Sequence, residues 1–468
     1  MNIKFGTDGW RGIIAEDFTF ENVRKVSQAI ADYVNSKQHT VSSPQLIVGY
    51  DRRFLSAEYA KIACEVFAAN GIKTYFTVNP APTPAITFAI KRKGLSAAVI
   101  ITASHNPAIF NGIKFKTQDA APADGYVTEK IEKLIGKHKP KTLVTNNALI
   151  KNVDVDEGYI KFIKSYIDFD IINKKKLTLL VDYMHGAGSG YLERLLKDTN
   201  CKLTAIRGER DVLFDGGNPE PVRRNLREFL KKSKISKPHL GIALDGDADR
   251  IAACGADGEY LNSGQIISLI LLHLLEHKKL KGMVVKTISG TSLIEKITED
   301  FGLKLLETPI GFKYISKIML EQDVLIGGEE SGGIGFKGYI PERDGIISGL
   351  LLLEMVAVRG KSIDKIMKDV NKRYGKFCYN RLDLKMPVKK GKTILAKLQK
   401  SPPETLSGKK IIQIKTYDGV KFILKDKSWL LIRPSGTEPV MRVYAEGSSS
   451  QSVNRLLNIG KNLVSKWN

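Results

Sequence analysis

Residues 97–107 read AAVIITASHNP, a short apolar run that passes directly into a loop of small and polar residues. Residues 177–188 (LTLLVDYMHGAG) and 283–291 (MVVKTISGT) have the same layout. Such runs, rich in β-branched residues, are typical of buried parallel strands. Amphipathic stretches with helical spacing lie between them, at residues 21–35, 57–70, 191–198, 226–232 and 263–275. The alternation predicts an α/β fold with parallel or mixed sheets, in which active sites lie at the carboxyl ends of strands.

The length of the chain indicates several domains. At roughly 100–200 residues per domain, 468 residues correspond to about three or four domains. Residues 137–156 are polar and weakly periodic, which suggests a linker, and a strand-rich tail follows residues 359–376. We expect three α/β domains and a smaller C-terminal α+β domain, with these bounds: 1–145, 146–256, 257–368 and 369–468.

The composition is that of a globular protein, with 43% hydrophobic, 8% aromatic and 26% charged residues. The most apolar stretches, 266–275 and 346–358, contain His273 and Glu354 and fall short of the roughly 18 uncharged residues of a membrane span. The first ten residues, MNIKFGTDGW, lack the apolar segment of a secretory signal. Four scattered cysteines without a CxxC pair fit a reducing compartment. We therefore expect a cytoplasmic protein with no membrane partner.

The net charge is the unusual feature of the composition. The 73 Lys and Arg exceed the 50 Asp and Glu, which gives +23. Such an excess fits a phosphorylated or nucleic-acid partner, or simply a lysine-rich solvated surface. The basic residues form short, scattered clusters without interleaved aromatics. We expect a solvated surface and no nucleic-acid partner.

Residues 240–250, LGIALDGDADR, end a predicted strand in three alternating carboxylates, Asp245, Asp247 and Asp249. Three carboxylates this close repel one another unless a cation neutralises them. Oxygen ligands favour Mg²⁺, Mn²⁺ or Ca²⁺, so the pattern predicts a metal loop rather than a turn with solvated aspartates. A strand followed by D-x-D also begins phosphatases of the haloacid-dehalogenase type. Those enzymes usually carry Thr or Val where this chain has Asp249, which favours the metal loop.

The loop TASHNP and the residues after it offer a nucleophile and a cation. Ser104 directly follows a predicted strand, His105 is adjacent, and Lys114 lies on the next short apolar segment. A serine hydroxyl is a poor nucleophile until a base or a charge activates it. Lysine acts as a base only where its surroundings lower its pKa. Taken alone, this loop is better explained as an ordinary polar turn.

Two glycine-rich loops complete the set of candidates. In RPSGTEP (433–439), Arg433, Ser435, Thr437 and the backbone amides around Gly436 could form an anion-binding nest. Guanidinium, hydroxyl and amide groups together are typical of phosphate binding. In GGEESGGIGF (327–336), the side chains after the first two glycines offer acceptors and donors for sugar hydroxyls. Neither loop matches a dinucleotide fingerprint or a P-loop.

Five motifs occur in one order along the chain: FGTDGWRG (5–12), TASHNP (102–107), DGDADR (245–250), GEESGG (328–333) and RPSGTEP (433–439). In this set the chain resembles the α-D-phosphohexomutase family, and within it the phosphoglucomutase/phosphomannomutase group. The resemblance covers essentially the whole sequence. It implies three similar mixed α/β sandwich domains and a smaller α+β domain around a central cleft, as a monomer or homodimer.

The resemblance also implies an activity and a role for each motif. The enzyme would interconvert hexose 1-phosphate and hexose 6-phosphate through a phosphoserine and a hexose 1,6-bisphosphate, which is both intermediate and activator. Ser104 matches the phosphoserine, which together with Asp245, Asp247 and Asp249 would hold one Mg²⁺. Lys114 matches the residue that transfers a proton, and Arg11 and His105 match residues beside the phosphoserine. Glu329 and Ser331 match the pair that binds sugar hydroxyls. The loop that binds the distal phosphate is matched by Arg433, Ser435, Gly436 and Thr437.

One loop departs from the family pattern. Residues 311–315, GFKYI, lie where the family keeps a sugar-recognition loop, and many members have a histidine there. This chain has Phe312 and Lys313 instead, so Lys313 is the candidate substrate contact.

The expected substrates follow from the sugar-binding motif. The phosphoglucosamine branch typically has GEQSGH, whereas this chain has Glu330 and Gly333 at the differing positions, which favours glucose and mannose phosphates. We expect both sugars to react, glucose 1-phosphate better. The alternatives are a phosphoglucosamine mutase, a metal-dependent sugar phosphatase and a non-catalytic sugar-phosphate binder.

Overall fold

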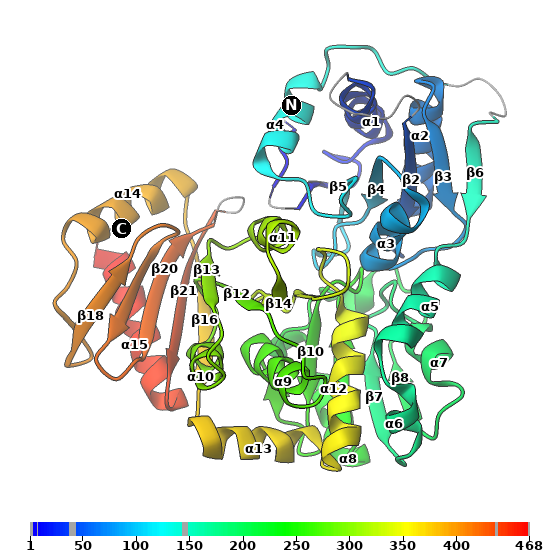
Figure 1. Ribbon diagram of the computed structural model, residues 1–468. Helices are drawn as coiled ribbons and strands as arrows, with labels where there is room; N and C mark the ends of the chain where they lie inside the picture. The colour runs from blue at the N-terminus through cyan, green and yellow to red at the C-terminus, as the bar shows by residue number, and fades with distance from the viewer. Residues whose placement is uncertain (1–2, 7, 37–43, 143–147, 436–438, 467–468) are drawn as a thin grey trace.

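The computed structural model describes residues 3–6, 8–36, 44–142, 148–435 and 439–466. Its sheets and helices form four successive units, which follow one another in the colours of Figure 1 from blue to red. The structure has the predicted α/β class in the first three units and an antiparallel α+β arrangement in the last.

Unit I contains a mixed sheet of strand order β1-β5-β4-β2-β3-β6. Strands β4, β2, β3 and β6 are parallel to one another, while β5 is antiparallel to both of its neighbours, β4 and β1. The strands are β1 (Trp10–Ile13), β2 (Gln45–Tyr50), β3 (Lys73–Thr77), β4 (Ala97–Ile101), β5 (Phe110–Thr117) and β6 (Ile150–Val153). The helices are α1 (Phe20–Asn35), α2 (Ser56–Ala69), α3 (Thr83–Lys93) and α4 (Gly125–Leu134).

Unit II contains a sheet of order β11-β10-β9-β7-β8, of which β9, β7 and β8 are parallel. The strands are β7 (Thr178–Asp182), β8 (Lys202–Ile206), β9 (Leu240–Leu244), β10 (Ile251–Cys254) and β11 (Tyr260–Leu261). The helices are α5 (Asp156–Tyr166), α6 (Phe169–Asn173), α7 (Tyr191–Leu196) and α8 (Arg227–Ser236), with 3₁₀ turns at Phe214–Gly216 and Arg223–Asn225.

Unit III contains a sheet of order β13-β12-β14-β15. The strands are β12 (Met283–Thr287), β13 (Leu305–Thr308), β14 (Val324–Gly328) and β15 (Ile334–Phe336). The helices are α9 (Ser263–Glu276), α10 (Ser292–Asp300), α11 (Phe312–Glu321), α12 (Gly345–Arg359) and α13 (Ile363–Tyr374).

A common strand order relates these three units. It reads β5-β4-β2-β3 in unit I, β10-β9-β7-β8 in unit II and β15-β14-β12-β13 in unit III. In each, one motif loop follows the equivalent parallel strand and leads into the antiparallel one: 102–107 after β4, 245–250 after β9 and 328–333 after β14. The sequence shows no strict repeat, because a shared strand order needs only apolar strands of similar length and not identical residues.

Unit IV is an antiparallel sheet of order β16-β21-β20-β19-β18-β17, with α15 packed against β21 and β16. Figure 1 shows it beside unit III, at the left. The strands are β16 (Cys378–Lys385), β17 (Thr405–Leu406), β18 (Lys409–Lys415), β19 (Val420–Leu424), β20 (Trp429–Pro434) and β21 (Val440–Gly447). The helices are α14 (Val388–Lys400) and α15 (Ser450–Lys466).

Two segments differ from the sequence-based expectation. The expected linker at 137–156 includes β6, which pairs in parallel with β3. Its polar residues suit an edge strand, and β6 is the last strand in the order of this sheet. The expected loop at 311–315 is mostly the first turn of α11, which begins at Phe312 behind a Gly311 with φ 132°.

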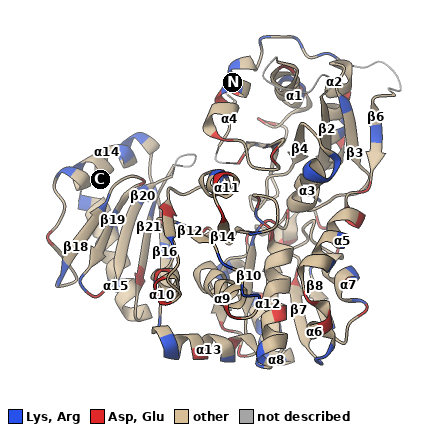
Figure 2. Cartoon of the chain, in the orientation of Figure 1, with Lys and Arg blue, Asp and Glu red and all other residues tan. Residues whose placement is uncertain are grey.

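The most apolar segments are core helices. Helices α9 and α12 pack against each other and are buried around most of their circumference. Among the residues described, no helix combines the length and apolar character needed to cross a membrane. Figure 2 shows Lys and Arg dispersed over the outer helices and strands of all four units.

Candidate active site

Loops from units I, II and III meet at one point. The Ser104 hydroxyl donates a hydrogen bond of 2.8 Å to Asp245 Oδ2, although the two residues are 141 positions apart. Arg250, at the end of the same aspartate loop, forms an antiparallel bridge with Gly333. The structure therefore brings together the three motif loops that occupy equivalent places in their units.

The Ser104 loop is held in one conformation by unit I. Ser104 has φ 52°, in the left-handed region that residues other than glycine rarely adopt. Its backbone N–H donates to Thr102 Oγ1 at 2.8 Å, and its carbonyl accepts from Arg53 at 2.6 Å. Thr102 in turn donates to Asp51 at 2.6 Å. These bonds fix the direction of a hydroxyl that is buried inside the protein.

The three aspartates form the oxygen-rich cluster that the sequence predicted. Asp245, Asp247 and Asp249 are 0%, 0% and 1% exposed, and one carboxylate oxygen of each lies within 4.8 Å of the others. Burial, and then the charges of Asp249 and Asp247, raise the pKa of Asp245 well above its usual value. Oδ1 of Asp247 and Oδ1 of Asp249 are buried without a hydrogen-bond partner among the described residues. This donor set fits a hard divalent cation such as Mg²⁺.

Lys114 lies against this cluster. Its Nζ lies 2.8 Å from Asp247 Oδ2, 2.7 Å from Asp249 Oδ2 and 3.0 Å from Asp8 Oδ2. Thr83, from α3, also donates to Asp247 Oδ2, at 2.6 Å. Burial lowers the pKa of Lys114, but the three carboxylates outweigh burial and raise it above the usual value. Lys114 is therefore protonated in this arrangement, and the three carboxylates hold its proton firmly.

A second ring of charges surrounds Lys114. Asp8 Oδ1 lies 3.0 Å from Lys116 Nζ, and Lys116 lies 2.5 Å from Glu342. Arg343 binds Asp8 and lies 2.7 Å from Asp249. Burial raises the pKa of Asp8, yet the neighbouring cations hold it well below its usual range. The ring joins units I, II and III by ion pairs that are almost fully buried.

Sequence reasoning missed several members of this ring. Asp8 lies inside a quoted motif but was not singled out, and Glu342 and Arg343 were not considered. The sequence signal for Glu342 and Arg343 is the stretch PERDG (341–345), which places three charged residues directly before an apolar helical segment.

Arg11 contacts the Ser104 loop, and His105 lies beside the serine. Arg11, on β1, donates to the Asn106 side chain in the Ser104 loop. His105 Nδ1 lies 3.3 Å from Ser104 Oγ. Burial, together with Arg250 and other cations, lowers the pKa of His105 well below its usual value. His105 is therefore a neutral hydrogen-bonding group near the hydroxyl.

Unit III contributes Glu329, directly after β14. Glu329 is 6% exposed and accepts the Gly311 N–H at 3.0 Å, and Arg343 lies 3.9 Å from it. Burial raises its pKa. Ser331, in the same loop, and Lys313, in the first turn of α11, are half-buried. The Glu329 carboxylate thus connects the 328–333 loop to Gly311, and both segments were expected from the sequence to bind the sugar.

Unit IV presents the predicted phosphate loop at the end of β20. Arg433 is 12% exposed and donates through Nε to Asp418 at 2.6 Å. Ser435 is buried. Two other predicted residues of this loop, Gly436 and Thr437, lie outside the described residues.

Comparisons with known proteins cover all four units. The matching families are described as phosphoglucomutase/phosphomannomutase alpha/beta/alpha domain I (residues 2–142), domain II (157–258) and domain III (262–374), and the C-terminal domain (358–458). A phosphoglucomutase/phosphomannomutase of Thermococcus kodakarensis is 31% identical, over 99% of both chains. The chain belongs to the phosphoglucomutase/phosphomannomutase family. It is accordingly an enzyme of the isomerase class.

Further relatives differ in the sugar named. A phosphoglucosamine/phosphogalactosamine mutase of Sulfurisphaera tokodaii is also 31% identical, over 99% of both chains. The crystal structure of a putative phosphomannomutase from Thermus thermophilus is 32% identical, with a TM-score of 0.89 over 99% of both chains. Within this phosphohexomutase family, the names alone therefore leave the substrate open.

Proposed function

We propose that the enzyme interconverts the 1- and 6-phosphates of glucose and mannose through a phosphoserine at Ser104 and a hexose 1,6-bisphosphate. The hydrogen bond between Ser104 Oγ and Asp245 carries this proposal. It places a fixed serine hydroxyl against the acidic cluster, which Lys114 and Arg343 also contact. Phosphoryl transfer depends mainly on such positioning and charge neutralisation.

The cofactor we propose is Mg²⁺. Asp245, Asp247 and Asp249 would hold it together with an oxygen of the seryl phosphate. When bound, the ion neutralises charge on the transferred phosphoryl group. One oxygen each of Asp247 and Asp249 is buried without a hydrogen-bond partner in the described part of the chain, which supports this assignment.

The residues around Ser104 manage charge and protons. As the phosphoryl group passes to the sugar, the Oγ–P bond breaks, a bond from phosphorus to the sugar oxygen forms, and the proton of the sugar hydroxyl ends on Ser104 Oγ. We assign the relay of this proton to Lys114, which begins protonated, gives a proton to Oγ and receives the one that the sugar hydroxyl releases. We assign Arg11 to the seryl phosphate as a fixed cation and His105 as a neutral hydrogen-bonding partner.

The other end of the substrate would be held by units III and IV. Glu329 and Ser331 would bind sugar hydroxyls, with Lys313 beside them. The distal phosphate would bind in the loop of Arg433, Ser435, Gly436 and Thr437. Because the bisphosphate must turn end for end, either of its phosphates would occupy this loop in turn.

The contacts of Glu330 support a neutral sugar over an amino sugar. Glu330 is paired with Arg381 of unit IV at 3.1 Å. An ammonium group at C2 of the sugar would be best bound by an uncommitted carboxylate, and the Glu330 side chain is engaged by a guanidinium. The naming of several relatives as phosphoglucosamine mutases keeps that activity as the second candidate.

Steady-state assays test the proposal and its rivals. The purified enzyme with Mg²⁺ is given glucose 1-phosphate, mannose 1-phosphate or glucosamine 1-phosphate, and both the 6-phosphate and free phosphate are measured. We expect conversion of the first two, with a higher kcat/KM for glucose 1-phosphate and no net phosphate release. A far higher kcat/KM for glucosamine 1-phosphate would establish the second candidate instead. Stoichiometric phosphate release would indicate a phosphatase.

A further inference from the structure

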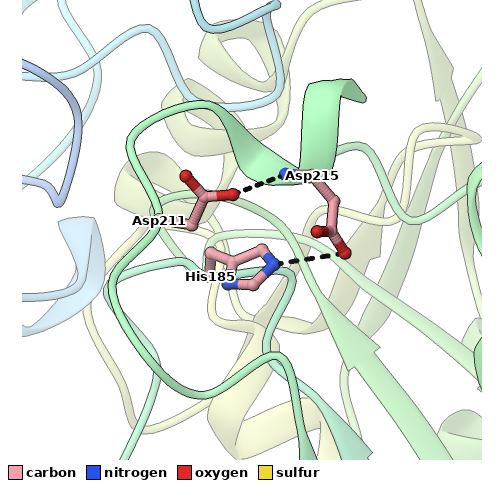
Figure 3. A group of neighbouring side chains, drawn as sticks. All are labelled: His185, Asp211 and Asp215. Atoms are coloured by element: carbon pink, nitrogen blue, oxygen red, sulfur yellow. Dashed lines mark hydrogen bonds and ion pairs between the residues drawn. The ribbon is translucent and has the colours of Figure 1, made fainter.

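Unit II has a second cluster of possible cation ligands, separate from the aspartate triad. It consists of His185, in the turn after β7, and of Asp211 and Asp215, in the long loop after β8 (Figure 3). One ligand atom from each lies within 4.8 Å of the others. The motif DYMHGAG drew attention in the sequence as a loop after a strand, and the proposed mutase chemistry does not use it.

The His185 ring is oriented for coordination. Its side chain is 3% exposed, and Nδ1 lies 3.1 Å from the carbonyl oxygen of Glu209, a distance at which the N–H donates to the carbonyl. In that tautomer Nε2 carries a lone pair. Nε2 is buried and has no hydrogen-bond partner among the described residues, and Asp215 Oδ2 lies 3.6 Å from it. A positive charge between this lone pair and the Asp215 carboxylate would stabilise the arrangement.

The spacing fits a metal ion. Ligands about 2.1 Å from a tetrahedral ion are about 3.4 Å from each other, close to the gap between His185 and Asp215. The Asp211 oxygens accept the backbone N–H groups of Leu213 and Asp215 at 2.9 and 2.7 Å, which fixes the carboxylate and leaves a lone pair on each oxygen. A backbone carbonyl bound to the far nitrogen of the ring is the usual support of a metal-ligating histidine.

We propose that His185, Asp211 and Asp215 form a second cation site, selective for Zn²⁺ over Mg²⁺. One imidazole nitrogen and two carboxylate oxygens suit Zn²⁺, whereas Mg²⁺ prefers oxygen ligands throughout. A fourth position remains open to water, because the Asp215 side chain is 63% exposed.

The loop that carries this site connects units I and II. Arg210 donates to the Arg52 carbonyl at 3.0 Å, and the Arg53 guanidinium lies 4.8 Å from the centre of the Phe214 ring. On the other side, Ala187 N–H donates to the Gly246 carbonyl at 2.9 Å, inside the aspartate loop. A bound Zn²⁺ would therefore stabilise a loop that contacts both units, without taking part in the reaction.

Zinc titration of the full-length chain tests the proposal. The protein is stripped with a chelator, returned to excess Mg²⁺ and titrated with Zn²⁺ by calorimetry. Asp215→Asn is the main variant because its exposed side chain makes misfolding a minor concern, and His185→Gln is the second. Asp198→Asn, another exposed aspartate of unit II, is the matched control.

We expect a Zn²⁺ site in the wild type, in Asp198→Asn and in Asp247→Asn. Removal of a ligand in Asp215→Asn should weaken this site by more than about tenfold. Zn²⁺ should raise the Tm of the wild type in Mg²⁺ buffer and leave that of Asp215→Asn unchanged. Equal zinc binding by wild type and Asp215→Asn would overturn the proposal. The proposal would also be overturned if the protein bound no zinc outside the triad and ¹⁵N NMR showed both nitrogens of the His185 ring protonated at neutral pH.

Discussion

Two carboxylate clusters lie at the same edge of the unit II sheet, yet they differ in burial and in ligand type. Asp245, Asp247 and Asp249 follow β9 and are almost completely buried. Asp211 and Asp215 follow β8, next to β7, and Asp215 is largely exposed. Like charges in a buried place repel strongly, so the triad needs compensating cations from two other units. Asp215 is screened by water and Asp211 is half-buried, so the second cluster needs less compensating charge than the triad.

The comparison shows that one sheet edge can provide two kinds of cation site. The triad has oxygen donors alone and lies against the Ser104 hydroxyl, whereas the second cluster includes a nitrogen donor, His185. We therefore expect perturbation of the triad to change catalysis and perturbation of the second cluster to change metal binding and stability.

Metal removal should have the largest effect. Chelation followed by gel filtration should lower kcat by at least about 10³-fold, because the ion supplies several kcal/mol of charge stabilisation. Addition of Mg²⁺ alone should restore activity while the His185 cluster stays without zinc, which metal analysis checks. If recovery of activity required Zn²⁺, the assignment of catalysis to the triad and of stability to the His185 cluster would be wrong.

Asp247→Asn should follow in size. The change removes one negative charge from the triad and keeps the shape of the side chain, so we expect kcat to fall by about 10²–10³-fold, as for loss of one electrostatic catalytic group. Asp198→Asn should retain wild-type kinetics. Near-normal turnover by a folded Asp247→Asn protein would contradict the assignment of the triad.

Arg433→Ala extends the comparison to a region that would bind an anion. Asp418 holds the guanidinium and also accepts the Ile310 N–H of unit III at 2.7 Å, so the residue is positioned between the two units. Loss of a charge-assisted contact should raise KM for glucose 1-phosphate by about 10-fold, with a smaller change in kcat. Arg455→Ala, a change at an exposed position of α15, is the control. An unchanged KM for Arg433→Ala would remove this residue from the phosphate site.

Asp215→Asn should have the smallest catalytic effect. In saturating Mg²⁺ we expect kcat/KM within about twofold of wild type, because the second cluster touches neither Ser104 nor the triad side chains. A large loss of activity, with zinc binding intact, would show that the loop acts on catalysis by another route.

The sequence predicted the local structure well. The helices expected at 57–70 and 263–275 are confirmed as Ser56–Ala69 and Ser263–Glu276, because each is set by the period of its own apolar residues. The α/β class and the C-terminal α+β unit are also confirmed.

The sequence did not predict which charged side chains surround the triad. Asp8 and Arg343 are bound to each other across 335 positions, and no local pattern specifies such a contact. The same holds for the ion pair of Lys116 with Glu342. Nor did the motif loops reveal that the three units share one strand order, since that relation lies in topology and not in residue identity.

The central claim is that Ser104 carries the transferred phosphate. The most direct measurement is the intact mass of the freshly purified protein, with the peptide that contains Ser104 mapped by tandem mass spectrometry. We predict an added mass of about 80 Da on Ser104, the mass of one phosphorylation, and its absence in Ser104→Ala. A Ser104 that stays unmodified, even after incubation with glucose 1,6-bisphosphate and Mg²⁺, would contradict the phosphoserine mechanism.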